Sequence, residues 1–156
     1  MTHEAPTIDA VKAEENSLHI PTFQYDFAWT LGSRIRQKAE ERKLPVGIEV
    51  RHGTDIVFAT LLPGATIDNF GWTRRKCAVV HRFHRSSLRV RLEAEAKNYD
   101  FNQKFGLPLT DYVASGGGFP LILRGGTFVG SVAVSGLPDV QDHALITETL
   151  GELLGV

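Results

Sequence analysis

The last third of the chain carries the pattern that most constrains the fold. The stretch "GGGFPLIL" (116–123) indicates a strand that begins after the glycines, and "RGG" then supplies a turn. In the following "TFVGSVAVSG", Phe128, Val132 and Val134 recur at even spacing, which predicts a second strand. Because a short glycine turn joins the two strands, they are expected to pair antiparallel.

An amphipathic helix is predicted directly after these strands, in "LPDVQDHALITETLGELLG" (137–155). Pro138 suits the first helical turn, and Asp139 and Asp142 favour the positive end of the helix dipole. Gly155 is a suitable C-terminal cap. The buried stripe of this helix is expected to consist of Leu145, Ile146, Leu150, Leu153 and Leu154.

The first two thirds of the chain repeat the combination of helices and paired strands. Helices are predicted over residues 8–18 and from a cap at Asp26, and Gly32 in the second helix indicates close packing. In "VGIEVRHGTDIVFATLL" (46–62), alternating apolar residues around a glycine turn indicate a hairpin. The segments "IDNFGWTRRKCAVVHRFH" and "LRVRLEAEAKNY" predict two further helices.

Hairpin-connected strands between groups of helices define the expected fold class. We predict an α+β fold with a central antiparallel sheet flanked by helices. With 156 residues the chain is long enough for one domain with a sizeable core. The domain is expected to span residues 7–156, after a flexible N-terminal tail at residues 1–6.

The glycine run "SGGGFPL" raises the question of a phosphate-binding loop. Such loops place their glycines between a strand and a helix, so that helix amides face the anion. Here the glycines lead into a strand, and Pro120 follows Gly118 by two residues. We therefore interpret the run as a sharp chain bend, or as a place where another backbone or a flat ligand approaches closely.

Composition excludes several classes of protein. A net charge of −1 gives no overall attraction to nucleic acid or anionic membranes, so a nucleic-acid partner is not expected. No apolar run reaches the roughly 18 residues that a membrane span needs. The single Cys77 excludes an internal disulfide. With a polar, acidic N-terminal segment, the chain is expected to be a cytoplasmic protein without membrane contact.

Residues 115–146 resemble a known signature. "SGGGFPLILRGGTFVGSVAVSGLPDVQDHALI" is similar to that of the haem-degrading-domain family, the GlcG/HbpS-like proteins. The matching residues are Gly117, Pro120, Leu121, Gly126, Gly130, Val134, Ser135, Gly136, Gln141 and Asp142. The middle of the chain resembles an uncharacterised-protein-family branch of that group, through Asp68, Asn69, Trp72, Arg74, Arg75, Lys76, Arg82, Phe83, Ser86 and Ser87.

The resemblance covers nearly the whole chain from about residue 7 and carries its own expectations. It implies a profilin-like form of the α+β fold and assembly into homo-oligomers. Some relatives are linked to binding or degrading haem, or to sensing, which makes haem the candidate cofactor. Haem degradation rests on this resemblance alone, and the branch has no settled activity.

A basic segment is the clearest electrostatic feature. Seven of the seventeen Lys and Arg residues lie between Arg74 and Arg91, and no acidic residue occurs between Asp68 and Glu93. The segment suits a nucleic-acid surface, a solvated helix face or subunit interface, or one wall of a pocket for an anionic ligand. Nothing in the chain resembles a known nucleic-acid-binding motif, and the other two interpretations remain open.

No catalytic residue or metal site is identified. His81 and His84 are three residues apart, but no nearby Asp or Glu completes a metal-ligand set, so we interpret them as surface or capping residues. Cys77 lies among positive charges that would lower a thiol pKa, but it has no recognisable catalytic partner. His143 follows Asp142 at a helix start, where a neutral, hydrogen-bonding role is expected.

Two functional hypotheses follow. The first is an oligomeric small-molecule binding protein whose pocket lies between the basic helix and the start of the glycine-led strand, with haem or another anionic ligand. The second is an oligomeric interaction or scaffold protein in which these segments form contacts and no ligand is turned over. The expected ligand-binding residues are Arg75, Lys76, His84, Ser86, Ser87, Gly117, Phe119 and Pro120.

Overall fold

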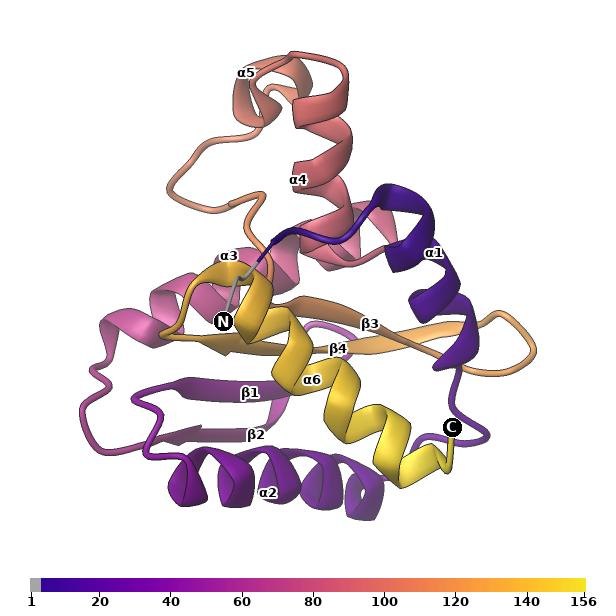
Figure 1. The fold of residues 1–156 in the computed structure, drawn as a ribbon, viewed down its shortest axis with the longest axis vertical. Coiled ribbons are helices and arrows are strands. Elements are labelled where there is room, and N and C mark those ends of the chain that lie inside the picture. Colours follow the sequence, from indigo (N-terminus) through magenta and orange to yellow (C-terminus); the bar gives the residue numbers. More distant parts are fainter. Residues whose placement is uncertain (1–3) are drawn as a thin grey trace.

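The computed structural model describes residues 4–156. Within these residues the chain forms six helices and four strands (Figure 1). In chain order they are α1 (Ile8–Ser17), α2 (Tyr25–Glu41), β1 (Gly47–His52), β2 (Asp55–Leu61), α3 (Asp68–Phe83), α4 (Ser87–Ala96), α5 (Phe101–Phe105), β3 (Gly118–Ile122), β4 (Phe128–Ser135) and α6 (Asp139–Leu154).

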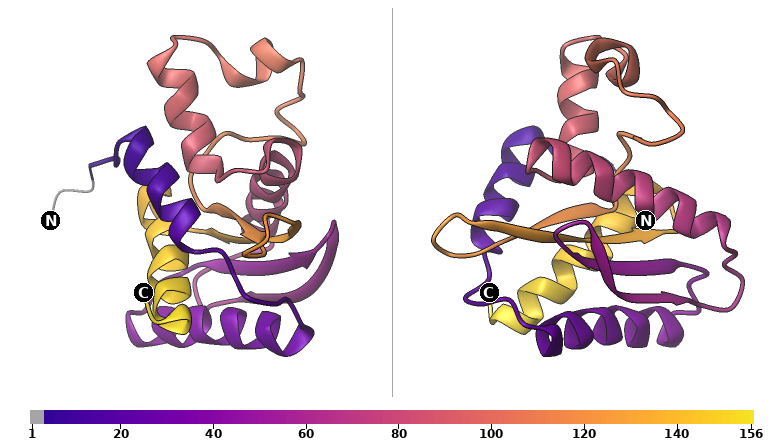
Figure 2. Two further views of the ribbon diagram at one scale, coloured as in Figure 1. Left: turned by 90° about the vertical axis from the view of Figure 1, so that its right-hand side faces the viewer. Right: turned by 180° about the vertical axis from the view of Figure 1, so that it is seen from behind.

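The four strands form one sheet in the order β2-β1-β4-β3. Every neighbouring pair is antiparallel, and both predicted hairpins, β1–β2 and β3–β4, are present. The views in Figures 1 and 2 place α6 on one side of the sheet and α3 on the other. This arrangement confirms the predicted single-domain α+β fold with an antiparallel sheet flanked by helices.

The two faces of the sheet differ in chemistry. Ile48 and Val50 pair with Val134 and Val132, and all four belong to the main hydrophobic core with side chains of α2 and α6. The residues between them point to the opposite face because side chains alternate along a strand. That face carries Glu49, Arg51, Ser131 and Ser135 and is covered by α3. A buried polar layer therefore lies between α3 and the sheet.

Several predicted helix ends are confirmed and others are corrected. The Ser86 side chain caps α4 by accepting from the Arg89 amide at 3.1 Å, and Gly155 ends α6 in a left-handed conformation. Asp26 is not the cap of α2, because the helix begins one residue earlier, after Gln24. Pro138 precedes α6 as its cap, although it was expected inside the first turn.

The short helix α5 was not predicted. Together, α4, α5 and the loop that returns to β3 project away from the sheet in Figure 1. A small separate cluster holds this region together, with Val79, Val90, Ala94 and Phe101 buried at its centre. The returning loop brings Tyr112 back towards α3, where it helps to line a cleft described below.

The structure describes only part of the predicted N-terminal tail. Of the tail predicted at residues 1–6, residues 1–3 lie outside the described part, and residues 4–6 precede α1 without regular secondary structure. None of the helices found in residues 4–156 combines the length and apolarity needed to cross a bilayer.

Candidate functional site

The predicted site at the start of β3 has a shallow depression of about 260 Å³ beside it, lined in part by Lys76 and Ser115, while the glycine run itself is closely approached by other protein groups. Gly117 adopts a φ of +119°, and an added Cβ there would lie 2.7 Å from the Lys76 Nζ and 2.5 Å from the Val134 carbonyl oxygen. The next amide, of Gly118, donates to Ser87 Oγ at 2.8 Å. The glycine run therefore allows a close approach of buried groups at a chain bend, and β3 begins at its last glycine, Gly118, one residue earlier than predicted.

Three other predicted ligand residues are buried structural residues. Ser86 caps α4, and its own amide donates to the buried Glu15 at 3.1 Å. Phe119 is 1% exposed and belongs to the main core on the side of α2 and α6. Pro120 is buried on the other face of β3, opposite Ser131. The structure does not bring Phe119 and Pro120 to one face of a common pocket.

The remaining two, Arg75 and His84, lie on the outer side of α3. The Arg75 guanidinium lies 4.3 Å from the centre of the Trp72 ring and donates to the carbonyls of Gly71 and Leu109 at 3.1 and 3.2 Å. His84 ends α3 in a left-handed conformation, and its exposed ring stacks on Phe128 with 4.3 Å between centroids. His84 is thus the capping residue that the sequence suggested.

Lys76 takes part in a buried ion pair. It is 2% exposed and donates to Asp142 Oδ2 at 3.0 Å and to the Val134 carbonyl at 2.9 Å. Asp142 also accepts from the Leu137 amide at 3.0 Å. Burial raises the pKa of Asp142 to about 6, against the lowering influence of Lys76 and the backbone donors. The ion pair and its hydrogen bonds therefore connect α3, β4 and α6 inside the protein.

An open cleft of about 320 Å³ lies on the opposite flank of α3. It is lined by Arg51, Thr54, Arg74, Cys77, Ala78, His81, Arg82 and Tyr112. Three of these side chains are guanidinium groups, and none is a carboxylate. Arg82 is exposed, whereas Arg74 contacts Asp111 at 3.4 Å across the rim. The cleft is therefore a concave, positively charged surface.

A buried carboxylate positions one of the three arginines. Glu49 is 1% exposed in the centre of the sheet, where it accepts from Thr73 Oγ1 and from Arg51 Nε. The Arg51 Nη1 atom donates to the Thr54 carbonyl at 2.9 Å. Because an unpaired buried charge is costly, Glu49 fixes Arg51 at the cleft.

The floor of the cleft contains a neutral histidine and a thiol. His81 Nε2 lies 2.9 Å from Ser131 Oγ, and Ser131 also contacts the Cys77 thiol. Burial lowers the pKa of His81 to about 4, with further contributions from Arg51 and His84. Burial and the Glu49 charge raise the pKa of Cys77 to about 12. The positive charges near Cys77 therefore do not activate it as a nucleophile.

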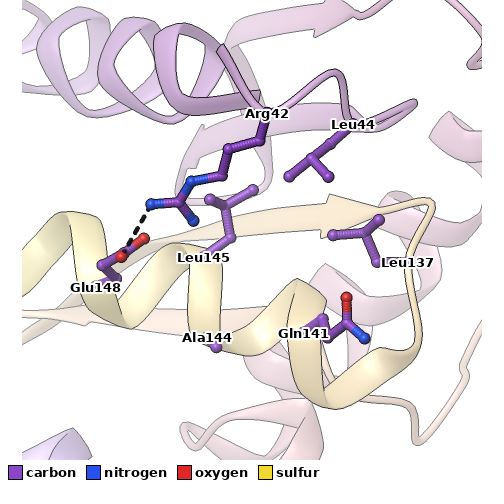
Figure 3. Close-up of a pocket in the computed structure, with 7 residues that line it drawn as sticks. All are labelled: Arg42, Leu44, Leu137, Gln141, Ala144, Leu145 and Glu148. Atoms are coloured by element: carbon purple, nitrogen blue, oxygen red, sulfur yellow. Dashed lines mark hydrogen bonds and ion pairs between the residues drawn. The ribbon is translucent and has the colours of Figure 1, made fainter. Parts of the chain in front are cut away.

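A second depression, of about 370 Å³, lies between the end of α2 and α6. Figure 3 shows its apolar side chains, which include Leu44, Leu137 and Leu145, and the Arg42–Glu148 ion pair at 3.0 Å. The Arg42 hydrogen bond lowers the pKa of Glu148. Arg42 is the one arginine that lines this groove and it is matched by a carboxylate, whereas the cleft beside α3 also presents the exposed Arg82, so the groove is less suited to an anion.

Among residues 4–156, no three His, Cys, Asp or Glu side chains gather in a way that would hold a metal ion. His143 Nε2 contacts Glu14 at 2.6 Å, the hydrogen-bonding role expected from its position. The cleft arginines Arg51, Arg74 and Arg82 were absent from the predicted ligand set. Side chains alternate along the strand "VGIEVRHG", so the sequence does predict that Arg51 lies on the face of the sheet away from the main core.

The antiparallel sheet with helices on both faces defines a single-domain α+β protein, and comparison with known proteins gives its family. Residues 23–150 match the model "Haem degrading protein HbpS-like". A "UPF0303 protein" of Paraburkholderia phymatum is 43% identical over 151 residues, which cover 97% of this chain and 92% of the relative. A second, from Acidobacterium capsulatum, is 42% identical over 152 residues with the same two coverages. The chain belongs to the HbpS-like haem-degrading-protein family.

Solved structures share the fold at low sequence identity. The Ybr137w protein superposes with a TM-score of 0.89 at 24% identity and covers 97% of this chain, with 90% of its own length matched. A PduOC–haem complex has a TM-score of 0.70 at 14% identity and covers 85% of this chain, with 94% of its own length matched. At these identities the comparison establishes the shared fold, and the haem belongs to the PduOC structure.

Proposed function

We propose that this chain is a binding protein for a small anionic ligand and that the basic cleft beside α3 is its binding site. The observation that carries the proposal is the gathering of Arg51, Arg74 and Arg82 around one concave surface without a lining carboxylate. Guanidinium groups bind carboxylate, phosphate and sulfate oxygens through paired, charge-assisted hydrogen bonds. Arg51 is already held in place by Glu49, which reduces the entropy lost on binding.

Haem is the ligand that the family description suggests, and the cleft fits it only in part. The guanidinium groups suit the two carboxylates of a haem. A flat macrocycle, however, needs a largely apolar slot, and most of the lining side chains are charged or polar. The Nε2 atom of His81 is hydrogen-bonded to Ser131, and His84 does not line the cleft. Neither histidine is therefore placed to bind haem iron, and we favour a smaller anion.

Self-association forms the second part of the proposal. Trp29, Ile67 and Leu109 are 66%, 78% and 60% exposed in the single chain. Large apolar side chains on a surface favour contacts between protein molecules. We infer that the ligand-binding unit is a homo-oligomer. The alternative, an interaction or scaffold protein without ligand turnover, draws on the same exposed residues and predicts no saturable anion binding.

Calorimetric titration with sulfate tests the binding site. Replacement of the exposed Arg82 in the Arg82→Gln variant removes one charge-assisted hydrogen bond, worth roughly 1.5–3 kcal/mol, and should weaken binding by about 10-fold or more. Arg34→Gln is the matched control, because Arg34 is an exposed arginine on α2. Equal affinities for the wild-type protein and Arg82→Gln would contradict the proposed site.

A haem titration followed by absorbance separates the two ligands. The proposal predicts no saturable Soret shift that depends on His84 or Arg75. A saturable shift that disappears in His84→Ala or Arg75→Ala would favour haem and oppose the smaller anion.

A further inference from the structure

We propose that anion binding in the cleft is coupled to the uptake of one proton by His81, so that the site binds its ligand more tightly in acid. This inference rests on the proposed function and adds a regulatory property to the same site. It also restricts the ligand to oxyanions that remain ionised below pH 5, such as sulfates, sulfonates or phosphate esters.

His81 lies where a bound anion would act on it. It lines the cleft together with the three arginines and projects from the last turns of α3. Phe128 of β4 packs edge-on against the ring, with 5.0 Å between centroids. A ligand held by Arg51 and Arg82 would therefore lie beside this imidazole, where its charge acts on the histidine proton equilibrium.

The hydrogen-bond network around His81 accepts both its neutral and its protonated state. The Nε2 atom of His81 lies 2.9 Å from Ser131 Oγ, so neutral His81 can accept from the hydroxyl at Nε2 and protonated His81 can donate from Nε2–H to the hydroxyl oxygen. The Cys77 thiol beside Ser131 can serve as the acceptor for the reversed hydroxyl. Protonation thus needs a rotation of one O–H bond and no movement of α3 or β4.

The charged groups around the His81 ring are mainly positive. Arg51 from β1 and His84 from α3 disfavour its charged form, and Arg74 and Arg82 line the same cleft. From β4 the ring contacts Ser131 and Phe128, and Tyr112 of the returning loop lines the same cleft. The buried carboxylate of Glu49 is already bound to Arg51 and Thr73. No lining side chain supplies a negative charge for protonated His81. A bound anion would supply it.

The sign and size of the effect follow from linkage. The pKa of His81 is about 4 in the free protein, where 6.5 is the ordinary value. If the anion restores the ordinary value, affinity rises as the pH falls through 6.5 and levels off below 4. Under that condition, binding at pH 5 should be about 20-fold tighter than at pH 7.

Calorimetry with sulfate provides the test, because sulfate does not titrate between pH 5 and 8. Titrations at pH 5 in two buffers of different ionisation enthalpy count the protons taken up on binding. We expect an uptake approaching one proton in the wild-type protein and none in His81→Gln, which keeps a side-chain partner for Ser131. His84→Gln is the matched control and should retain the uptake.

The outcomes separate this inference from the proposed function. Sulfate binding that is sensitive to Arg82→Gln but shows no proton uptake and equal affinity at pH 5 and 7 would overturn the coupling and leave the binding site intact. Absence of sulfate binding at every pH would overturn both. Proton uptake that persists in His81→Gln would assign the proton to another group and would refute the role of His81.

Discussion

Replacement of Gly117 by alanine should destabilise the protein severely. The residue has a φ of +119°, a region that costs an L-amino acid about 1–3 kcal/mol. The new Cβ would also lie 2.5 Å from the Val134 carbonyl oxygen and 2.7 Å from the Lys76 Nζ. Overpacking of a closed site typically costs about 1–3 kcal/mol. The two contributions together predict a loss of roughly 3 kcal/mol in the free energy of unfolding.

Urea unfolding measured by circular dichroism is the suitable assay. Gly106→Ala is the matched control, since Gly106 has a φ of +65° but no atom within 4 Å of an added Cβ. The control therefore reports the backbone contribution alone, expected at about 1 kcal/mol. If Gly117→Ala lowers the free energy of unfolding by no more than Gly106→Ala does, the close contacts of Gly117 with Val134 and Lys76 do not require a glycine there. That result would refute the prediction.

Three further predictions concern buried groups. The pKa of Asp142 is raised to about 6 from 3.8, so its contribution to stability appears as the pH falls through 6 and is complete below 3.8. Between pH 7 and pH 5 the free energy of unfolding of the wild-type protein should therefore rise by roughly 1 kcal/mol. The Asp142→Asn variant should lack this rise when both proteins are unfolded with urea. The Cys77 thiol, with a pKa of about 12, should react with maleimide at pH 7 only at the rate of global unfolding, and rapid labelling of the native protein would contradict its burial. Ser86→Ala should lower the unfolding free energy by about 1 kcal/mol through loss of the α4 cap, and a thermal midpoint equal to that of the wild-type protein would exclude the capping role.

The fold was predictable because the hydrophobic periodicity was clear in the segments that form the two central strands and α2. Alternation in "VGIEV" and "TFVGSVAVSG" marked β1 and β4, which are the two central strands. The four-residue spacing of Leu31, Ile35 and Ala39 marked the buried side of α2. The helix α5 has only five residues, which is too short for a periodic signal, and it depends on the cluster around Phe101.

The site was less predictable because it depends on the orientation of α3. The buried stripe of this helix contains Thr73, Lys76, Cys77 and Val80, so a charged residue occupies a position that periodicity assigns to apolar side chains. Lys76 is buried because Asp142 lies opposite it, 66 residues later in the chain. Local sequence does not reveal such a partner. The same rotation of the helix carries Arg74 and Arg82 into the cleft.

The most direct test of the proposed binding site is a titration of the ¹⁵N-labelled protein with sulfate, followed by amide chemical shifts. The account predicts saturable shifts confined to the cleft, at Arg51, Thr54, His81, Arg82 and Tyr112. Shifts that never saturate, or that gather around Arg42 and Glu148 or around Gly117, would contradict it.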